Sequence, residues 1–200
     1  MAVEQPDGQR VPKVSLLVPV YNVERYLREC LESARRQTLD DIEIVCVNDG
    51  STDGSRAIIG EFLEIDPRFR VIDKENSGYG ASMNRGLEEA RGEFVGILES
   101  DDFLDADALE VLYDAARAAD AEVAKADFYL HWSEPDPRDE RFGWVEADAA
   151  GVVDPRDYRE VFFCKPSIWS ALYRRSFLEE NGIRFLETPG ASYQDSAFNF

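Results

Sequence analysis

The sequence predicts an α/β domain in which helices flank a mainly parallel central sheet. Two observations favour this fold class. Along the first two thirds of the chain, short runs of apolar and β-branched residues alternate with stretches whose apolar residues recur at helical spacing. The short runs are apolar almost throughout, which is typical of strands that helices cover on both faces. Strands joined by helices form right-handed βαβ units, so we expect parallel neighbours.

The expected elements follow one another in the order of a nucleotide-binding α/β domain. We expect strands over residues 14–20, 42–48, 69–73, 93–98 and 122–130. The helices between them are expected over residues 24–37, 55–65, 79–91 and 105–119. Gly92 is the expected C-cap of the third helix, and Asp105 is the expected N-cap of the fourth.

The last third of the sequence has a different character. Residues 132–151 are polar, acidic and proline-bearing, and they predict either a long loop or an irregular hairpin. Asp154 followed by Pro155 favours a helix start. Three further elements are expected: a strand over residues 168–173, a short helix over residues 174–181 before Gly182, and the beginning of a helix over residues 193–200.

The composition excludes some classes of protein. Of the 200 residues, 44% are hydrophobic, which is enough for a core and argues against general disorder. The 41 acidic and 22 basic residues give a net charge of −19, which repels phosphate backbones, so nucleic acid is not an expected partner. Three widely spaced cysteines, no signal peptide and no membrane-spanning apolar run predict a cytoplasmic protein without a transmembrane segment. The inner face of the membrane is an alternative location.

Polar residues follow each expected strand at the point where the strand ends. They occupy residues 19–22, 48–51, 74–79, 99–102 and 131–132. Parallel sheets bind ligands beyond the carboxyl ends of their strands. We therefore expect these residues to meet along one edge of the sheet and to line a binding cleft.

The most informative of these segments is Glu99-Ser100-Asp101-Asp102, which carries three carboxylates within four residues. Crowded carboxylates repel one another unless a cation lies among them. Mg²⁺ or Mn²⁺ often binds one or two carboxylates together with substrate phosphates, and it neutralises the charge of a diphosphate leaving group. The alternative is that Asp101 or Asp102 caps a turn that leads into the next helix.

Four other polar or aromatic residues are candidates for either binding or structure. Asp49, where the second strand ends, is interpreted as an acceptor for a base N–H, whereas Asp53 is interpreted as an N-cap. His131, the only histidine, is either a metal or phosphate contact or an exposed loop residue. Trp169 is interpreted as a core residue or as the wall of the cleft, where its ring would stack on a sugar.

Five motifs occur in order along the chain: residues 19–22 (PVYN), 48–53 (NDGSTD), 76–84 (NSGYGASMN), 92–94 (GEF) and 99–102 (ESDD). Together they resemble the motifs of the family 2 glycosyltransferases, which share the GT-A fold. The resemblance runs from about Val14 to the last residue. Residues 165–198 are similar to the acceptor half of bacterial members.

The resemblance implies an inverting transfer of a sugar from a nucleoside-diphosphate sugar, usually a UDP-sugar, with Mg²⁺ or Mn²⁺ as cofactor. The acceptor would be a hydroxyl of a glycan or of a lipid-linked molecule, in the synthesis of cell-surface polysaccharide or glycoconjugate. The chain then divides into a flexible leader over residues 1–13, a nucleotide-sugar-binding half over residues 14–131, and an acceptor-side segment over residues 132–200, which would be truncated.

By position, the resemblance also assigns site residues. Tyr21 would flank the nucleobase and Asp49 would bind it, while Asp101 would approach the ribose and Asp102 would bind the metal and the diphosphate. The donor nucleotide set is Pro19, Tyr21, Asn22, Asp49, Ser51, Gly78, Asn84 and Asp101, and the metal ligands are Asp101 and Asp102. Asp195 matches the carboxylate proposed as the catalytic base. The candidate acceptor or phosphate contacts are His131, Trp169 and Gln194.

Two residues depart from the family pattern. Glu99 stands where Asp is commoner, so its longer side chain is expected to alter the metal shell, and Asn48 replaces a common first Asp, which is expected to matter little.

Two other functions stay open. A nucleotidyltransferase would need a Gly-rich, basic phosphate loop, which residues 18–24 lack. A non-catalytic sugar- or nucleotide-binding domain would be favoured by loss of Asp102 or Asp195, and both are present; without the resemblance, Asp195 would be interpreted as a helix cap.

Overall fold

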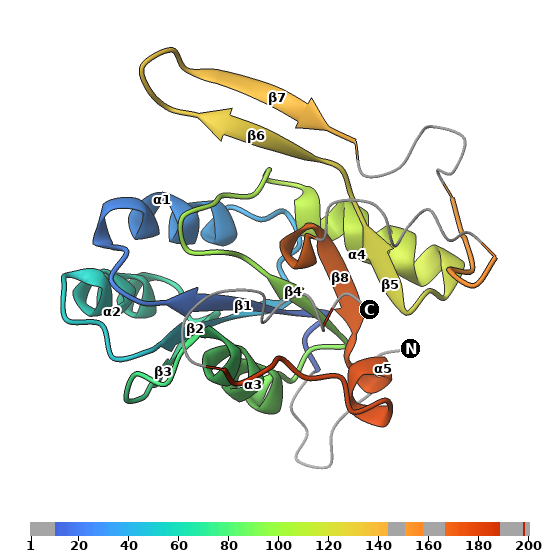
Figure 1. Ribbon diagram of the computed structural model, residues 1–200, viewed down its shortest axis with the longest axis horizontal. Coiled ribbons are helices and arrows are strands. Elements are labelled where there is room, and N and C mark those ends of the chain that lie inside the picture. The colour runs from blue at the N-terminus through green and yellow to red at the C-terminus, as the bar shows by residue number, and fades with distance from the viewer. Residues whose placement is uncertain (1–10, 144–150, 158–166, 189–197, 199–200) are drawn as a thin grey trace.

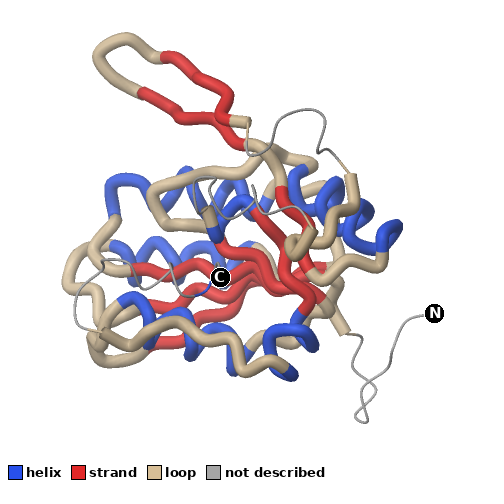
Figure 2. Tube along the Cα trace, turned by 45° about the vertical axis from the view of Figure 1, so that its right-hand side comes forward, coloured by secondary structure: helices blue, strands red, loops and turns tan. Residues whose placement is uncertain are grey.

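The computed structural model describes residues 11–143, 151–157, 167–188 and 198, and it shows an α/β fold around a six-stranded sheet (Figures 1 and 2). The strand order is β3-β2-β1-β4-β8-β5, and β6 and β7 form a separate two-stranded sheet. The strands are β1 Val14–Val20, β2 Ile42–Asn48, β3 Phe69–Asp73, β4 Phe94–Ile97, β5 Val123–Lys125, β6 Phe128–Trp132, β7 Arg138–Phe142 and β8 Ala171–Arg174. The helices are α1 Glu24–Arg35, α2 Ser55–Ile65, α3 Tyr79–Glu89, α4 Ala108–Ala119 and α5 Arg175–Glu180, with a 3₁₀ turn at Ile168–Ser170.

The first four strands confirm the predicted parallel part of the sheet. β1 lies between β2 and β4 and is parallel to both, and β3 is parallel to β2. β1, β2, β3 and α2 have the predicted bounds, whereas α1, α3, β4 and α4 are shorter than predicted.

Two predicted helix caps are wrong. α3 ends before Gly92, which instead packs against β1: its N–H donates to Ser15 Oγ (2.8 Å), and a Cβ there would overlap the Ser15 backbone. α4 begins at Ala108, so Asp105 lies ahead of the helix, and its carbonyl accepts a bond from Gln37 Nε2 (2.7 Å). In both cases a contact between residues far apart in the sequence determines the local conformation, and the local pattern does not contain that contact.

The predicted fifth strand is wrong in extent and direction. Residues 122–130 hold two elements, because β5 ends at Lys125 and β6 begins at Phe128. β5 is antiparallel to β8, which inserts between β4 and β5. Since β8 comes from much later in the chain, the order of elements along the sequence does not reveal the insertion. β6 pairs with β7, so the hairpin alternative is confirmed as far as residue 142, with its first strand taken from the predicted fifth strand, and residues 144–150 lie outside the described chain. The hairpin projects from the body (Figure 1).

The C-terminal elements match the prediction in part. The segment expected as a strand over residues 168–173 begins as a 3₁₀ turn and continues as β8. α5 is followed by Gly182 in the left-handed region (φ 62°), whose N–H donates to the carbonyl of Glu179 (3.2 Å), as a C-capping glycine does. Residues 155–157 form a turn after Asp154. The rest of that expected helix, and nearly all of the expected C-terminal one, lie outside the described residues.

Helices cover both faces of the sheet, as apolar strands require. α1, α2 and α4 pack on one face through residues such as Leu31, Phe62 and Leu109. α3 and α5 pack on the other face through Met83 and Leu178. Within the described chain, no helix is long and apolar enough to cross a membrane.

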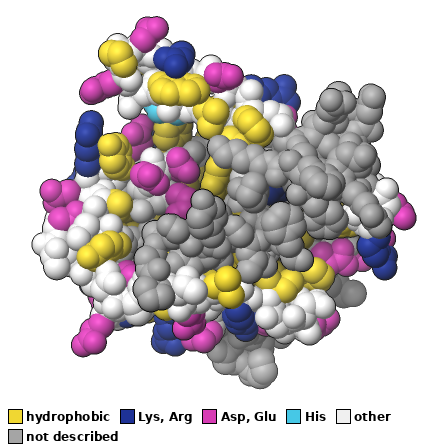
Figure 3. Space-filling view, in the orientation of Figure 1, with side chains coloured by type: hydrophobic (Ala, Val, Ile, Leu, Met, Phe, Trp, Pro, Cys, Tyr) yellow, Lys and Arg dark blue, Asp and Glu magenta, His cyan; other side chains and the backbone are white. Residues whose placement is uncertain are grey.

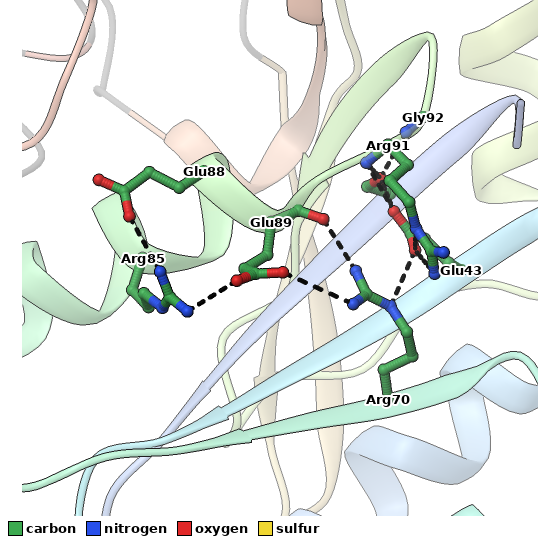
Figure 4. A network of polar contacts seen from close by, with 8 residues as sticks. Glu43, Arg70, Arg85, Glu88, Glu89, Arg91 and Gly92 are labelled. Carbon is green, nitrogen blue, oxygen red and sulfur yellow. Dashed lines mark hydrogen bonds and ion pairs between the residues drawn. The ribbon is translucent and has the colours of Figure 1, made fainter. Parts of the chain in front are cut away.

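A buried ionic network lies at the edge of the sheet where β1, β2 and β3 begin (Figure 4). The Glu43 carboxylate accepts hydrogen bonds from Ser15 Oγ (2.5 Å), Arg91 N (2.8 Å), Arg91 Nη2 (2.8 Å) and Arg70 Nε (3.0 Å). Burial on its own would raise the pKa of Glu43, but the bonds from Ser15 and Arg91 and the charge of Arg70 hold it below its usual value. The network joins three strands at the edge opposite to their carboxyl ends.

Candidate functional site

The carboxyl ends of β1 and β2 are joined by the side chain of Asn22. This residue lies in the left-handed region (φ 53°), which asparagine tolerates. Its N–H donates to Ser51 Oγ (3.2 Å), and its Oδ1 accepts a bond from the Thr52 N–H (2.8 Å). Pro19 is buried within β1, so of this motif Tyr21 and Asn22 reach the surface, where the Tyr21 ring is exposed.

Asp49 is a buried carboxylate that orders the start of α3. It is 5% exposed, and its Oδ1 accepts bonds from Lys74 Nζ and from the Ser77 N–H (2.9 Å). Its Oδ2 accepts a bond from the Gly78 N–H (3.0 Å). Gly78 precedes α3 with φ 92°, a conformation that favours glycine. The Asp49 carboxylate is therefore held in one orientation by a cation and two backbone N–H groups.

Lys74 and Asn48 belong to this site. Both were expected among the polar residues at the strand ends, but no specific contact was predicted for either. Lys74 Nζ also donates to Ser82 Oγ (3.3 Å), so it joins Asp49 to the second turn of α3. Asn48 Nδ2 donates to Asp73 Oδ1 (2.8 Å), and its Oδ1 accepts a bond from the Ser51 N–H (3.2 Å). An Asp in place of Asn48 would set two carboxylates against each other, so the amide at this position has a physical reason. The sequence did carry a signal for Lys74. It is a basic residue directly after β3, and β3 pairs with β2, the strand that Asp49 follows.

Asp53 has a structural role, although the N-cap of α2 is Gly54 and not Asp53 as expected. Its Oδ1 accepts a bond from the Ser55 N–H (3.0 Å) at the start of α2, and its Oδ2 accepts one from the Glu24 N–H (3.1 Å) at the start of α1. One carboxylate therefore satisfies backbone donors at the beginning of two helices.

The segment after β4 forms a turn that presents acidic side chains. The Asp102 N–H donates to the carbonyl of Glu99 (3.0 Å), and the side chains of Asp101 and Asp102 are exposed. Glu99 Oε1 accepts a bond from Tyr79 Oη (2.5 Å) at the start of α3. Burial raises the pKa of the nearby Cys30 thiol well above its usual value, and Cys46 and the carboxylates of Asp102, Asp101 and Glu99 add to this shift. The three acidic side chains therefore lie within electrostatic reach of one buried thiol.

Asp101 and Asp102 fit a magnesium or manganese ion that a substrate also binds. Among the described residues, no group of three His, Cys, Asp or Glu side chains is placed to hold a metal ion without a substrate. Mg²⁺, however, is commonly bound through one or two carboxylates together with substrate phosphates. Asp101 and Asp102 are exposed on one turn, so they supply two carboxylates for such a site.

His131 lies in β6 near the turn of the hairpin, and Trp169 lies beside the base of the hairpin. The His131 ring packs edge-on against Phe103 (centroids 5.3 Å apart), the residue after Asp102, and its Nδ1 lies 2.7 Å from Asp139 Oδ1. On the face shown in Figure 3, acidic side chains gather beneath the projecting hairpin. Trp169 is partly exposed and packs edge-on against Phe128 (4.5 Å), so it belongs to the wall between the hairpin and the sheet.

Asn84 makes contacts that the sequence analysis did not anticipate. Its Nδ2 donates to the carbonyl of Phe185 (3.0 Å) and to Glu187 Oε1 (2.8 Å), and its Oδ1 accepts a bond from the Phe185 N–H (2.9 Å). Asn84 thus holds residues 185–187 against α3, and a nucleotide contact for it stays a prediction. Gln194 and Asp195 lie outside the described residues.

Comparison with known proteins decides the family. Residues 15–182 match the family model described as Glycosyl transferase family 2. The chain belongs to this family. The resemblance predicted from the five motifs is therefore confirmed, and the nucleotidyltransferase alternative is set aside.

Two family 2 relatives show how much of a longer protein the chain covers. It is 37% identical to the putative glycosyltransferase EpsH of Bacillus subtilis (strain 168) over 196 residues, which is 94% of this chain and 55% of that protein. It is 41% identical to the chondroitin synthase of Escherichia coli over 115 residues, which is 58% of this chain and 17% of the synthase. The chain spans about half the length of EpsH.

Solved structures confirm the predicted fold. The crystal structure of S. aureus TarS 1–349 matches 94% of this chain and 54% of its own, with a TM-score of 0.79 and 27% identity. The same TarS fragment in complex with UDP-GlcNAc matches 94% of this chain and 53% of its own, with a TM-score of 0.76 and 25% identity.

Proposed function

We propose that this family 2 domain binds a UDP-sugar and a divalent cation at the carboxyl ends of its parallel strands and transfers the sugar to a hydroxyl. One observation carries the proposal: a continuous series of side-chain contacts joins the ends of three adjacent strands. Asn22 joins β1 to β2, Asp49 joins β2 to the start of α3, and Tyr79 joins α3 to Glu99 after β4. A parallel sheet binds its ligand at this edge.

Base recognition is assigned to Tyr21 and Asp49. The exposed Tyr21 ring offers an apolar surface on which a nucleobase can stack. Lys74 Nζ and the Ser77 N–H already bond to Asp49 Oδ1, whereas Oδ2 accepts one described bond, from the Gly78 N–H. A carboxylate oxygen has room for a second donor, and the N–H of a uracil base would supply it. The complex of TarS with UDP-GlcNAc is consistent with a uridine donor.

The remaining groups serve the chemistry of transfer. Asp102, with Asp101, would hold Mg²⁺ or Mn²⁺, which stabilises the negative charge of the leaving diphosphate. An acceptor hydroxyl is a weak nucleophile at neutral pH, so a carboxylate within hydrogen-bond reach must take its proton, and Asp195 is the candidate. Attack from the side opposite to the diphosphate inverts the anomeric centre. His131, Trp169 and Gln194 are candidates for acceptor or phosphate contacts.

The wider process is also proposed. The synthesis of cell-surface polysaccharide or glycoconjugate is the process we propose, and a relative named chondroitin synthase supports a role in polysaccharide synthesis. The acceptor would then be a glycan or a lipid-linked molecule.

Calorimetric titration with UDP, in Mn²⁺ and in EDTA, tests the donor and the metal together. We expect UDP to bind more tightly in Mn²⁺ than in EDTA. Asp102→Asn should weaken UDP binding in Mn²⁺ by about 10- to 100-fold, because one or two charged interactions contribute that much affinity. Asp114→Asn on the exposed face of α4 makes the same change of charge and should leave UDP affinity unaltered. Equal affinity in Mn²⁺ and EDTA would contradict the metal role.

The alternative of a non-catalytic binding domain needs a second measurement. A thermal-shift series with UDP, GDP, CDP and their sugars identifies the donor, because only a bound ligand stabilises the fold. UDP release from the identified UDP-sugar is then measured with candidate acceptors. Stabilisation by UDP-sugars without any transfer or hydrolysis would favour the non-catalytic alternative, whereas stabilisation by GDP alone would contradict the uridine donor.

A further inference from the structure

Tyr79, the first residue of α3, contacts two parts of the molecule that the proposed reaction must hold at a fixed separation. Its hydroxyl donates to Glu99 Oε1 (2.5 Å) on the acidic turn after β4. Its ring packs edge-on against Phe185 (centroids 5.9 Å apart) on the acceptor-side segment. One side chain therefore touches both the turn that bears the candidate metal ligands and the segment that leads to Asp195.

The Phe185 side of this link is firmly anchored. Asn84 bonds to both backbone groups of Phe185, and a Cβ on Gly80 would overlap the carbonyl of Leu186, so α3 lies directly against this backbone. Phe198 stacks on Phe185 (4.3 Å, 17° between ring planes). Residues 185 and 198 flank the part of the chain that carries Gln194 and Asp195. Phe185 therefore rests directly on α3, and Phe198 is held beside it by the stacked rings.

The Glu99 side is anchored as well. The carbonyl of Glu99 accepts bonds from the Asp102 N–H (3.0 Å) and from Cys30 Sγ (3.5 Å), which fix the backbone of the acidic turn. A hydroxyl donating to a carboxylate forms a charge-assisted hydrogen bond, stronger than a neutral one. An Asp at position 99 would be one methylene shorter, so the longer side chain has a defined partner in this protein.

We infer that Tyr79 is a positioning residue for sugar transfer: by tying Glu99 to Phe185, it holds the acidic turn at a fixed place relative to Phe185 of the acceptor-side segment. This inference rests on the proposed function. The turn would hold the leaving diphosphate and the segment would hold the acceptor. A displacement of about 1 Å between reacting groups can lower the rate about 100-fold. Tyr79 itself needs no contact with either substrate.

The test compares Tyr79→Phe, which keeps the ring on Phe185 and removes the bond to Glu99, with the wild-type protein at full length. We expect kcat for transfer to fall about 10- to 100-fold, while the Kd for UDP in Mn²⁺ changes less than about threefold. Tyr26→Phe removes a hydroxyl from an exposed ring on α1 and is the matched control, with no expected effect on either quantity.

A double-mutant cycle on thermal unfolding, without any ligand, tests the link itself. Tyr79→Phe and Glu99→Gln should be non-additive, because the first removes the bond and the second removes the charge that strengthens it. Additive effects, an unchanged kcat in Tyr79→Phe, or a loss of UDP affinity that parallels the loss of kcat would each overturn the positioning role. A wild-type protein that neither binds UDP nor transfers sugar would instead refute the proposed function, and the cycle would still report whether Tyr79 and Glu99 are coupled.

Discussion

Replacing Glu43 by Gln is a direct test of how much the buried ionic network contributes to stability. The substitution keeps the size of the side chain and removes its charge, so Arg70 and Arg91 lose their shared partner. The Glu43 side chain is 5% exposed, whereas those of Arg70 and Arg91 are 29% and 44% exposed. Removing one partner of a fully buried pair costs about 3–5 kcal/mol. Because water reaches both arginines, we expect a smaller loss of about 2–3 kcal/mol.

Thermal unfolding measures this loss. In a domain of this size, 1 kcal/mol corresponds to about 2–4 °C, so the midpoint for Glu43→Gln should fall by about 4–12 °C. Glu61→Gln is the matched control, because Glu61 makes an exposed pair with Arg28, and such pairs contribute about 0–1 kcal/mol. If both substitutions lower the midpoint equally, the network is not a special source of stability.

The pH dependence of the same measurement supplies a second check. The pKa of Glu43 is lower in the folded protein than in the unfolded chain, so its ionised form stabilises the fold. That contribution is complete above the unfolded pKa, about 4.3, and is lost as the pH falls through the folded pKa. The difference in stability between the wild-type protein and Glu43→Gln should therefore be constant above about pH 5 and shrink in more acidic solution.

Two further predictions concern the proposed reaction. Asp49→Ala should lower UDP affinity by about 1–3 kcal/mol in calorimetry, since a buried charged acceptor is lost. Asp66→Ala removes a buried, arginine-paired carboxylate where β3 begins and should leave UDP affinity unchanged, so an equal loss in both variants would point to general destabilisation. In the full-length protein, Asp195→Asn should abolish transfer and leave the Kd for UDP nearly unchanged; retained turnover would remove Asp195 from the mechanism, and Asp114→Asn controls for the lost charge.

Much of the fold could be predicted because local pattern and burial agree over the first four strands. Every residue of β1 and β2 is buried, so a mainly apolar run, interrupted by Ser15 in β1 and Glu43 in β2, marks each strand. β5 is different: it is three residues long, its first residue Val123 is 40% exposed, and its partner β8 follows it only after the hairpin. No periodicity in residues 122–130 indicates that a later strand separates them from β4.

The candidate site shows the same limit. The rule that ligands bind beyond the carboxyl ends of parallel strands placed Asn22, Asp49 and Asp101 along one edge, and the structure confirms that placement. It did not show which way Asn84 points, because its partners Phe185 and Glu187 are about 100 residues away in the sequence. Strand ends can be predicted from local sequence, whereas contacts between the two halves of the chain depend on how those halves pack.

The hairpin of β6 and β7 has a consequence for the behaviour of the protein in concentrated solution. Within the described residues its two strands pair only with each other, so each presents an outer edge of backbone donors and acceptors. Such edges can pair with the edge of another molecule and begin aggregation. β7 reads Arg-Asp-Glu-Arg before its final Phe142, and this run of charges opposes the approach of a second strand. The hydrophobic core keeps each molecule folded, and the charges of β7 keep folded molecules apart.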